Sequence, residues 1–152
     1  MTPQSKQAAD YFSRSFNCSQ SVFTPFGTAA GIPEDLCLKV SCAFGGGMGR
    51  QQLTCGAVTG AMMALGIHFG KAMGDDEAKK KETYAKTLVL FKNFIAKHGT
   101  VNCRELMNGL DMNDPEDKKK IEELNLHKNL CTGYVVDAVE ITEGLIMEVE
   151  KP

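Results

Sequence analysis

The sequence predicts an all-α protein, an irregular bundle of about six to eight helices. Apolar residues recur at intervals of three and four along most of the chain, as they do on the buried face of a helix, and capping residues precede most of these stretches. Segments that alternate apolar and polar residues, as half-buried strands do, are missing. No linker or long repeat divides the 152 residues, so we expect a single helical domain over residues 1–152.

The first part of the chain contains three expected helices. Thr2-Pro3 combines an N-cap with a proline at the first helical position, and this helix should end near Asn17. Asn17 then starts a second helix, which Pro25 should bend or split because proline lacks the N–H of a regular helix. A third helix begins after Pro33 and continues to Phe44.

The later helices have equally clear starts. Acidic residues at 75–77 begin a long amphipathic helix that Gly99 closes. Asn102 starts a short helix, Asp114-Pro115 caps another, and Asn129 precedes the last one. The apolar face of the long helix consists of Tyr84, Leu88, Phe91 and Ile95.

Composition and charge exclude several classes of function. A net charge of −2 with 24% charged residues offers no basic surface for nucleic acid. The N-terminus lacks the apolar core of a signal peptide, and the least polar run, residues 57–66, is shorter than the roughly 20 residues that span a bilayer. We therefore expect a cytoplasmic protein that neither binds nucleic acid nor inserts into a membrane.

The stretch at residues 44–60 places a run of glycines just before a cysteine. Thr54 is the expected N-cap of the helix that follows, so Cys55 opens that helix. The helix dipole and free N–H groups favour a thiolate there, which predisposes Cys55 to attack a disulfide or to bind a metal. Gly56 and Gly60 leave one helix face almost bare, so another helix, a cofactor or a second subunit can approach it.

Four of the six cysteines share one kind of position. Cys18, Cys55 and Cys103 directly follow an expected N-cap, and Cys131 lies two residues after Asn129. We expect these helix starts to converge and to direct four sulfurs at one another or at a shared guest. Cys37 and Cys42 do not fit this pattern and are equally well explained as small buried hydrophobic residues.

The spacing of the cysteines excludes the familiar local motifs. A Cys-x-x-Cys pair is absent, which rules out ordinary ferredoxin and zinc-ribbon spacings, the thioredoxin motif and haem attachment through Cys-x-x-Cys-His. In a reducing compartment a framework of disulfides is also not expected. A site made of these cysteines has to be assembled by the tertiary fold.

Five segments together resemble a known family, the CGAxxG family of redox-active proteins (C_GCAxxG_C_C). The resemblance covers residues 11–145 and implies that the four cysteines of the family fall on Cys18, Cys55, Cys103 and Cys131. The pattern is also similar to the iron–sulfur part of split-Soret cytochromes, although their haem-attachment motif is missing. The segments are Asn17-Cys18, Phe44-Gly45-Gly46-Gly47-Met48-Gly49, Cys55-Gly56-Ala57-Val58-Thr59-Gly60, Cys103-Arg104-Glu105-Leu106 and Cys131.

Three hypotheses about function follow. In the first, the four cysteines hold a [2Fe–2S] cluster for electron transfer to a redox partner protein, with backbone N–H groups near the cluster sulfurs. In the second, Cys55 attacks a disulfide, and another of the four, or Cys42, resolves it. The third is a structural zinc site with four thiolates, or a plain helical scaffold. The glycines expected at the cofactor are Gly45, Gly46, Gly47 and Gly56.

Overall fold

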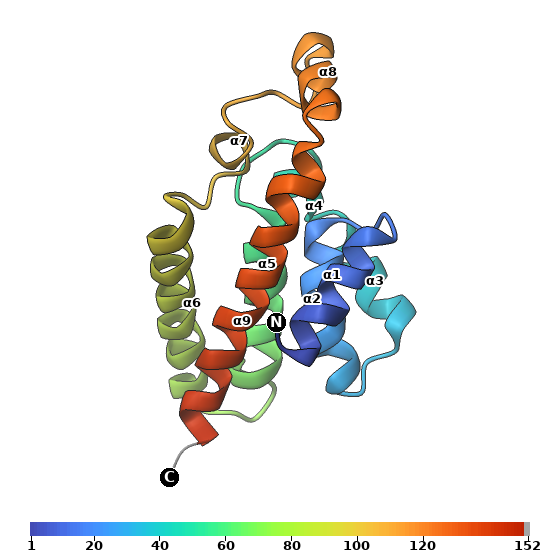
Figure 1. Cartoon of the computed structure of the whole chain (residues 1–152). Coiled ribbons are helices and arrows are strands. Elements are labelled where there is room, and N and C mark those ends of the chain that lie inside the picture. The colour runs from blue at the N-terminus through green and yellow to red at the C-terminus, as the bar shows by residue number, and fades with distance from the viewer. Residues whose placement is uncertain (151–152) are drawn as a thin grey trace.

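The computed structural model describes residues 1–150, with side chains placed through Glu148 (Figure 1). It confirms the all-α prediction, since an isolated β-bridge between Thr54 and Asn102 is the sole strand-like pairing in the described chain. Residues 151–152 of the expected domain lie outside this range. The elements are α1 (Pro3–Ser13), α2 (Cys18–Ala29), α3 (Glu34–Cys42), α4 (Gly45–Met48), α5 (Gly56–Phe69), α6 (Glu77–His98), α7 (Cys103–Leu106), α8 (Pro115–Glu123), the π-helical turn η1 (His127–Cys131) and α9 (Thr132–Glu150).

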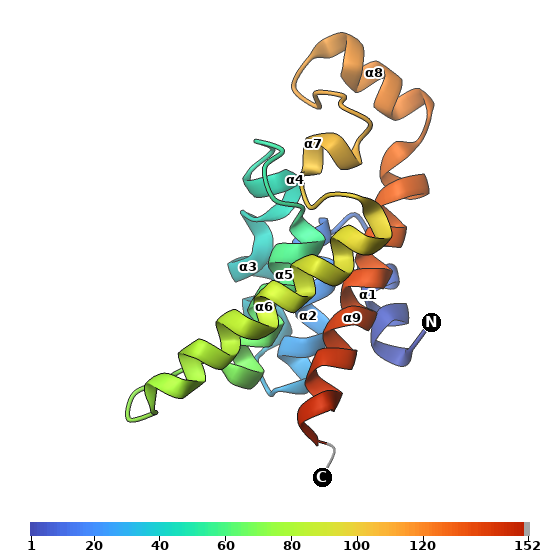
Figure 2. The ribbon, with the colours of Figure 1, turned by 90° about the vertical axis from the view of Figure 1, so that its left-hand side faces the viewer.

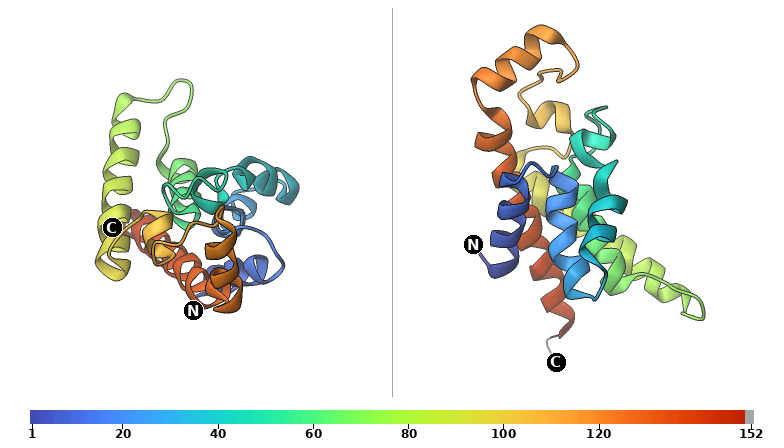
Figure 3. Two further views of the ribbon diagram at one scale, coloured as in Figure 1. Left: turned by 90° about the horizontal axis from the view of Figure 1, so that it is seen from above. Right: turned by 90° about the vertical axis from the view of Figure 1, so that its right-hand side faces the viewer.

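Helix α5 forms the centre of the bundle. It packs against α2, α6 and α9, and its residues Val58, Ala61 and Leu65 are fully buried (Figure 1). Short elements α7 and α8 lie together at one end of the molecule, beyond the main bundle (Figures 2 and 3). Across the described residues, no helix is long and apolar enough to cross a membrane.

The bare face of α5 is occupied by α2. A Cβ at Gly60 would lie 2.7 Å from the carbonyl oxygen of Ser19, and one at Gly56 would lie 2.3 Å from the sulfur of Cys18. These distances are too short for real contacts, so the two helices approach as closely as they do only because glycine occupies both positions. We expected another helix, a cofactor or a second subunit at this face, and the structure has a helix there. This leaves no room for a second subunit.

Most helix starts follow the capping residues as predicted. The side chain of Asn17 accepts a hydrogen bond from the N–H of Gln20, and Gln20 returns one to the N–H of Asn17, which completes a capping box. The side chains of Asp76, Asn102 and Asp114 each accept a hydrogen bond from a backbone N–H in the first turn of α6, α7 and α8.

Three details of the predicted helices are wrong. Helix α1 ends at Ser13 instead of near Asn17, because Ser15 adopts a left-handed φ of 70°. Of the two effects expected of Pro25, a split of α2 is wrong, because the helix continues through Pro25, whose fully buried side chain adds apolar packing where a backbone hydrogen bond is lost. Helix α3 ends at Cys42, two residues before Phe44.

The predicted face of α6 packs on the core only in part. Phe91 of that face contacts the main core, and Leu90 and Phe94 are fully buried, whereas Tyr84 and Leu88 are 63% and 72% exposed. The helix has two apolar stripes, and its N-terminal part projects away from the body of the molecule (Figure 2). Periodicity identifies an amphipathic helix but cannot decide which of two apolar stripes meets the core.

Candidate functional site

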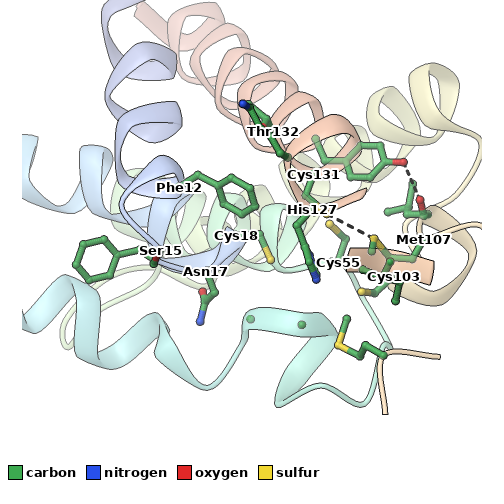
Figure 4. A pocket seen from close by; sticks show the side chains of 18 of the residues that line it. Phe12, Ser15, Asn17, Cys18, Cys55, Cys103, Met107, His127, Cys131 and Thr132 are labelled. Carbon is green, nitrogen blue, oxygen red and sulfur yellow. Dashed lines mark hydrogen bonds between the residues drawn. The ribbon is translucent and has the colours of Figure 1, made fainter. Parts of the chain in front are cut away.

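One cavity of about 1370 Å³ is lined by the four cysteines that the sequence singles out (Figure 4). Cys18 comes from α2, Cys55 precedes α5, Cys103 begins α7 and Cys131 ends η1. All six cysteines are free thiols. The fold therefore brings together residues that lie far apart in the sequence.

The two remaining cysteines differ from each other. Cys37 is buried away from the cavity, where its sulfur lies 3.8 Å from the carbonyl oxygen of Ile32 and fills space left by Gly27. This position matches the interpretation as a small buried hydrophobic residue. Cys42 is exposed and lines the cavity beside Asn17, whose side-chain amide donates to the carbonyl of Cys42 over 2.8 Å. Cys42 is thus a fifth thiol at the cavity, although not a buried one.

Cys18 lies at the first position of α2, and backbone N–H groups surround its sulfur. The amides of Ser19, Gly46 and Gly56 donate towards it. Gly45 permits this arrangement, because a Cβ there would lie 2.2 Å from the side chain of Asn17. The helix start and the glycine segment thereby form a single polar cradle around one sulfur.

Cys55 and Cys103 are held beside each other by backbone hydrogen bonds. The N–H of Cys55 donates to Val101 over 2.8 Å, and the N–H of Cys103 donates to Leu53 over 2.6 Å. These bonds flank the bridge between Thr54 and Asn102. Thr54 is therefore a bridge residue and not the predicted N-cap, a position that Cys55 itself occupies without any side-chain cap. The sequence gives no local sign of this pairing.

Cys131 is not in the first turn of a helix that follows Asn129. It is the last residue of the π-helical turn η1, which runs directly into α9, and the side chain of Asn129 donates to the carbonyl of Leu124. The sulfur of Cys131 lies 3.6 Å from that of Met107, which is almost fully buried (Figure 4). Met107 directly follows α7, and nothing in the sequence distinguishes it from an ordinary core methionine.

The glycine segment adopts left-handed backbone conformations. Gly46 and Gly47 have φ values of 63° and 66°, so the four residues labelled α4 form an irregular turn more than a helix. A Cβ at Gly47 would lie 2.7 Å from the Cβ of Cys103. Among the glycines expected at a cofactor, Gly45 and Gly46 line the cavity, while Gly47 supports Cys103 and Gly56 supports Cys18 from behind.

Burial raises the pKa values of the cavity thiols, whereas a lowered pKa was predicted for Cys55. Burial, and then the neighbouring sulfurs, raise the pKa of Cys55 well above its ordinary value, despite its place at the start of α5. The same two causes raise the pKa of Cys103 to about 11 and that of Cys131 to about 12. Burial also raises the pKa of Cys18, although the surrounding N–H groups oppose the change. The expectation of a ready thiolate at Cys55 is therefore wrong for the protein without a guest, because desolvation outweighs the helix dipole.

The four sulfurs influence one another without converging on one point. Each of the shifts at Cys55, Cys103 and Cys131 includes the charge of at least one other cavity cysteine. In the described part of the chain, no group of three or more His, Cys, Asp or Glu side chains is close enough to hold a single metal ion. A two-iron cluster takes its four cysteines in two pairs, one pair on each iron, and does not need three sulfurs around one point.

Comparison with known proteins gives two matches. A family model described as "Putative redox-active protein (C_GCAxxG_C_C)" matches residues 16–145. A protein of Archaeoglobus fulgidus, described as "Uncharacterized protein", is 26% identical over 144 residues, which cover 90% of this chain and 89% of that protein. No solved structure matches the chain.

Proposed function

The chain belongs to the C_GCAxxG_C_C family of redox-active proteins, and from this premise we propose that it is an electron-transfer protein whose cavity holds a [2Fe–2S] cluster. The ligands are Cys18, Cys55, Cys103 and Cys131. The observation that carries the proposal is the shared cavity, which four thiols from four separate elements line together. When bound, such a cluster supplies one-electron redox chemistry.

The chemistry of the donors supports an iron–sulfur guest. Thiolates are the usual ligands of these clusters, and four of them are sufficient for a [2Fe–2S] centre. Each of the four thiols is protonated at neutral pH because burial raises its pKa. A bound cation reverses that balance, since its positive charge stabilises a thiolate in a buried place.

The polar cradle around Cys18 supports a redox role for the site. Backbone N–H groups of Gly46 and Gly56 donate towards the sulfur of Cys18. Hydrogen bonds to a ligating sulfur withdraw electron density from it and raise the reduction potential of a cluster. Because a side chain at Gly56 would collide with Cys18, the glycine keeps the amide close enough to donate. These residues would tune the potential as well as hold the site open.

The test is to isolate the protein without oxygen and to measure its visible spectrum together with its iron and sulfide content. We expect a coloured protein with about two irons and two sulfides per chain. Cys55→Ser should abolish or strongly weaken the colour. Cys42→Ser is the matched control, because Cys42 lines the cavity but is not among the proposed ligands, and it should keep both colour and iron. A colourless, iron-free wild-type protein would refute the cluster.

A thiol–disulfide protein is the second candidate, and the exposure of Cys42 favours it. Cys42 lines the same cavity as the four buried thiols, so a disulfide partner has access to at least one sulfur there. The high pKa of Cys55 argues against it as the attacking group, because the thiolate is the nucleophile. Alkylation of reduced and oxidised samples decides the matter, since an unchanged number of free thiols at physiological potentials excludes this function.

Zinc ranks below both candidates. Four thiolates around one zinc ion require the sulfurs to move closer than they are, because no three metal-binding side chains of the described residues meet at one point. We further propose that the protein works in the cytoplasm with a separate redox partner protein. A homodimer also stays a proposal, and it would have to use a surface other than Gly56 and Gly60.

A further inference from the structure

We infer that the cavity also binds a small organic anion, held beside the cysteines by Arg50 and its cationic neighbours. Its binding rests on the residues that line the cavity and does not require the proposed cluster. Pockets for small molecules occupy about 300–1,000 Å³. A cavity of about 1370 Å³ therefore has room for such a molecule as well as for a four-cysteine centre.

Cations outnumber carboxylates in the lining of the cavity. Arg50, Lys118 and Lys128 line it together with His127, and Glu122 supplies the one carboxylate among the described lining residues. Three positive charges against one negative charge leave an excess of two in the lining. None of these three cations takes part in an ion pair among the described side chains. Unpaired cations in a concave site attract anions.

The backbone fixes Arg50 over the cavity. Arg50 has a left-handed φ of 66°, and its carbonyl accepts a hydrogen bond from the side chain of Asn113 over 2.8 Å. Its side chain folds across Gly46, where an added Cβ would lie 3.0 Å from the Cγ of Arg50. A non-glycine residue in this conformation is strained, and such strain collects at ligand sites.

His127 joins Arg50 in the lining of the cavity. It comes from η1 and lies between Cys18 and Cys55 in the close view (Figure 4). Partial burial, and then the positive charge of Arg50, lower the pKa of His127. An imidazole and a guanidinium in the lining of one cavity offer an anion both a hydrogen bond and a charge.

The side of the cavity opposite Cys103 and Met107 carries aromatic side chains among polar ones such as Ser15 and Asn17. Phe12 faces it from α1, with Phe16 nearby in the lining (Figure 4). A ligand that meets both walls has a negative group for Arg50 and an apolar body for the phenylalanines. An aromatic or aliphatic carboxylate has this character, whereas an inorganic anion lacks the apolar part.

The experiment is a titration of the full-length, ¹⁵N-labelled protein with benzoate, followed by amide chemical shifts, with neutral benzamide as the matched probe. We expect saturable shifts around residues 12–18, 45–50 and 127–131, with benzamide at least about tenfold weaker. Arg50→Gln should weaken benzoate binding about tenfold, and Lys128→Gln about threefold. Lys119→Gln is the control, because Lys119 adjoins Lys118 in sequence but pairs with Glu123 and does not line the cavity.

Equal binding of benzoate and benzamide, shifts that do not saturate, or unchanged affinity in both cavity variants would overturn the inference. Lys128 is exposed on η1, so its variant remains informative if Arg50→Gln does not fold. Titrating iron-free and iron-loaded samples separates this inference from the proposed function. If the protein binds benzoate but never takes up iron, the anion site is supported and the cluster is refuted. If it takes up iron but does not bind benzoate, the cluster is supported and the anion site is refuted.

Discussion

The two sides of the cysteine cavity are built in different ways. Cys18 and Cys55 belong to the main hydrophobic core, together with the fully buried residues of α5 and α9. Cys103 and Cys131 belong to a second, smaller core with Met107 and Ile121, which α7, α8 and η1 enclose at the end of the molecule (Figures 2 and 3). One side therefore rests on long packed helices and the other on short elements, tied to the first through the bridge beside Cys103.

This difference predicts which side of the cavity opens more easily. Regions with small cores and short elements open at lower free energy than the centre of a bundle. We expect the side of Cys18 and Cys55 to keep its shape without a guest. The side of Cys103 and Cys131 should depend on a guest to reach full stability, because ligation joins the two cores through sulfur.

Iron removal should produce the largest change in amide exchange. If the cluster forms, chelating it should lower protection in residues 103–131 by about 100-fold, the effect of losing a ligand present at 100 times its dissociation constant. Residues 56–69 should change far less, because they lie in the main core. Hydrogen exchange followed by mass spectrometry checks this, and equal changes on both sides would contradict the comparison.

Gly47→Ala should be the most damaging glycine substitution on the Cys103 side. The new Cβ would lie 2.7 Å from the Cβ of Cys103 and 2.6 Å from the Cα of Gln52, at a φ of 66°. Left-handed strain adds about 1–2 kcal/mol to an overpacking cost of about 1–3 kcal/mol. Urea unfolding measures the sum. Gly49→Ala is the control, because it has a φ of 63° but open space around it, and it should lose only the strain.

Gly60→Ala should have a smaller effect, confined to the packing of α2 on α5. Its Cβ would meet the backbone oxygen of Ser19 at 2.7 Å, and we expect a loss of about 1–3 kcal/mol. Gly66→Ala on the same helix has nothing within 4 Å and should gain about 0.5–1 kcal/mol. Thermal or urea unfolding of both variants tests this. A neutral Gly60→Ala would mean that the two helices separate easily.

The smallest effect expected is a loss of stability at high pH in the metal-free protein. Folding raises the pKa of Cys103 to about 11 and of Cys131 to about 12, so the folded state holds protons that the unfolded state releases near pH 9. Stability is then complete below pH 9 and falls as pH rises towards these values, by about 1 kcal/mol per thiol at pH 10. Replacing both residues with alanine should flatten the pH dependence of urea unfolding, and an unchanged slope would contradict it.

The helix starts were predictable because their signals are local. The side chains of Asn17 and Asn102 each accept a hydrogen bond from the N–H three residues later. A short stretch of sequence is therefore enough to predict these helix starts. Cys131 was misplaced because η1 continues into α9 without any cap between them. Because α9 continues directly from η1, no capping residue marks this boundary in the sequence.

The contents of the site were predictable only in part. Four of the five cysteines that line the cavity were selected from the sequence, whereas Cys42 was left outside the pattern. The pairing of Thr54 with Asn102 joins residues nearly fifty positions apart, as the antiparallel bridge between them shows, and no local pattern encodes it. The prediction of a thiolate at Cys55 was wrong because burial raises the pKa of this thiol. A sequence indicates where a helix starts, but it does not show how deeply the thiol is buried.

The bridge beside Cys55 and Cys103 also dictates when the site can exist during synthesis. The bridge forms only after α5 and α6 have both emerged from the ribosome and folded back, and Cys131 is translated later still. A growing chain therefore cannot bring all four thiols together before residue 131 has been translated. Whatever the pocket accepts has to arrive at a finished protein.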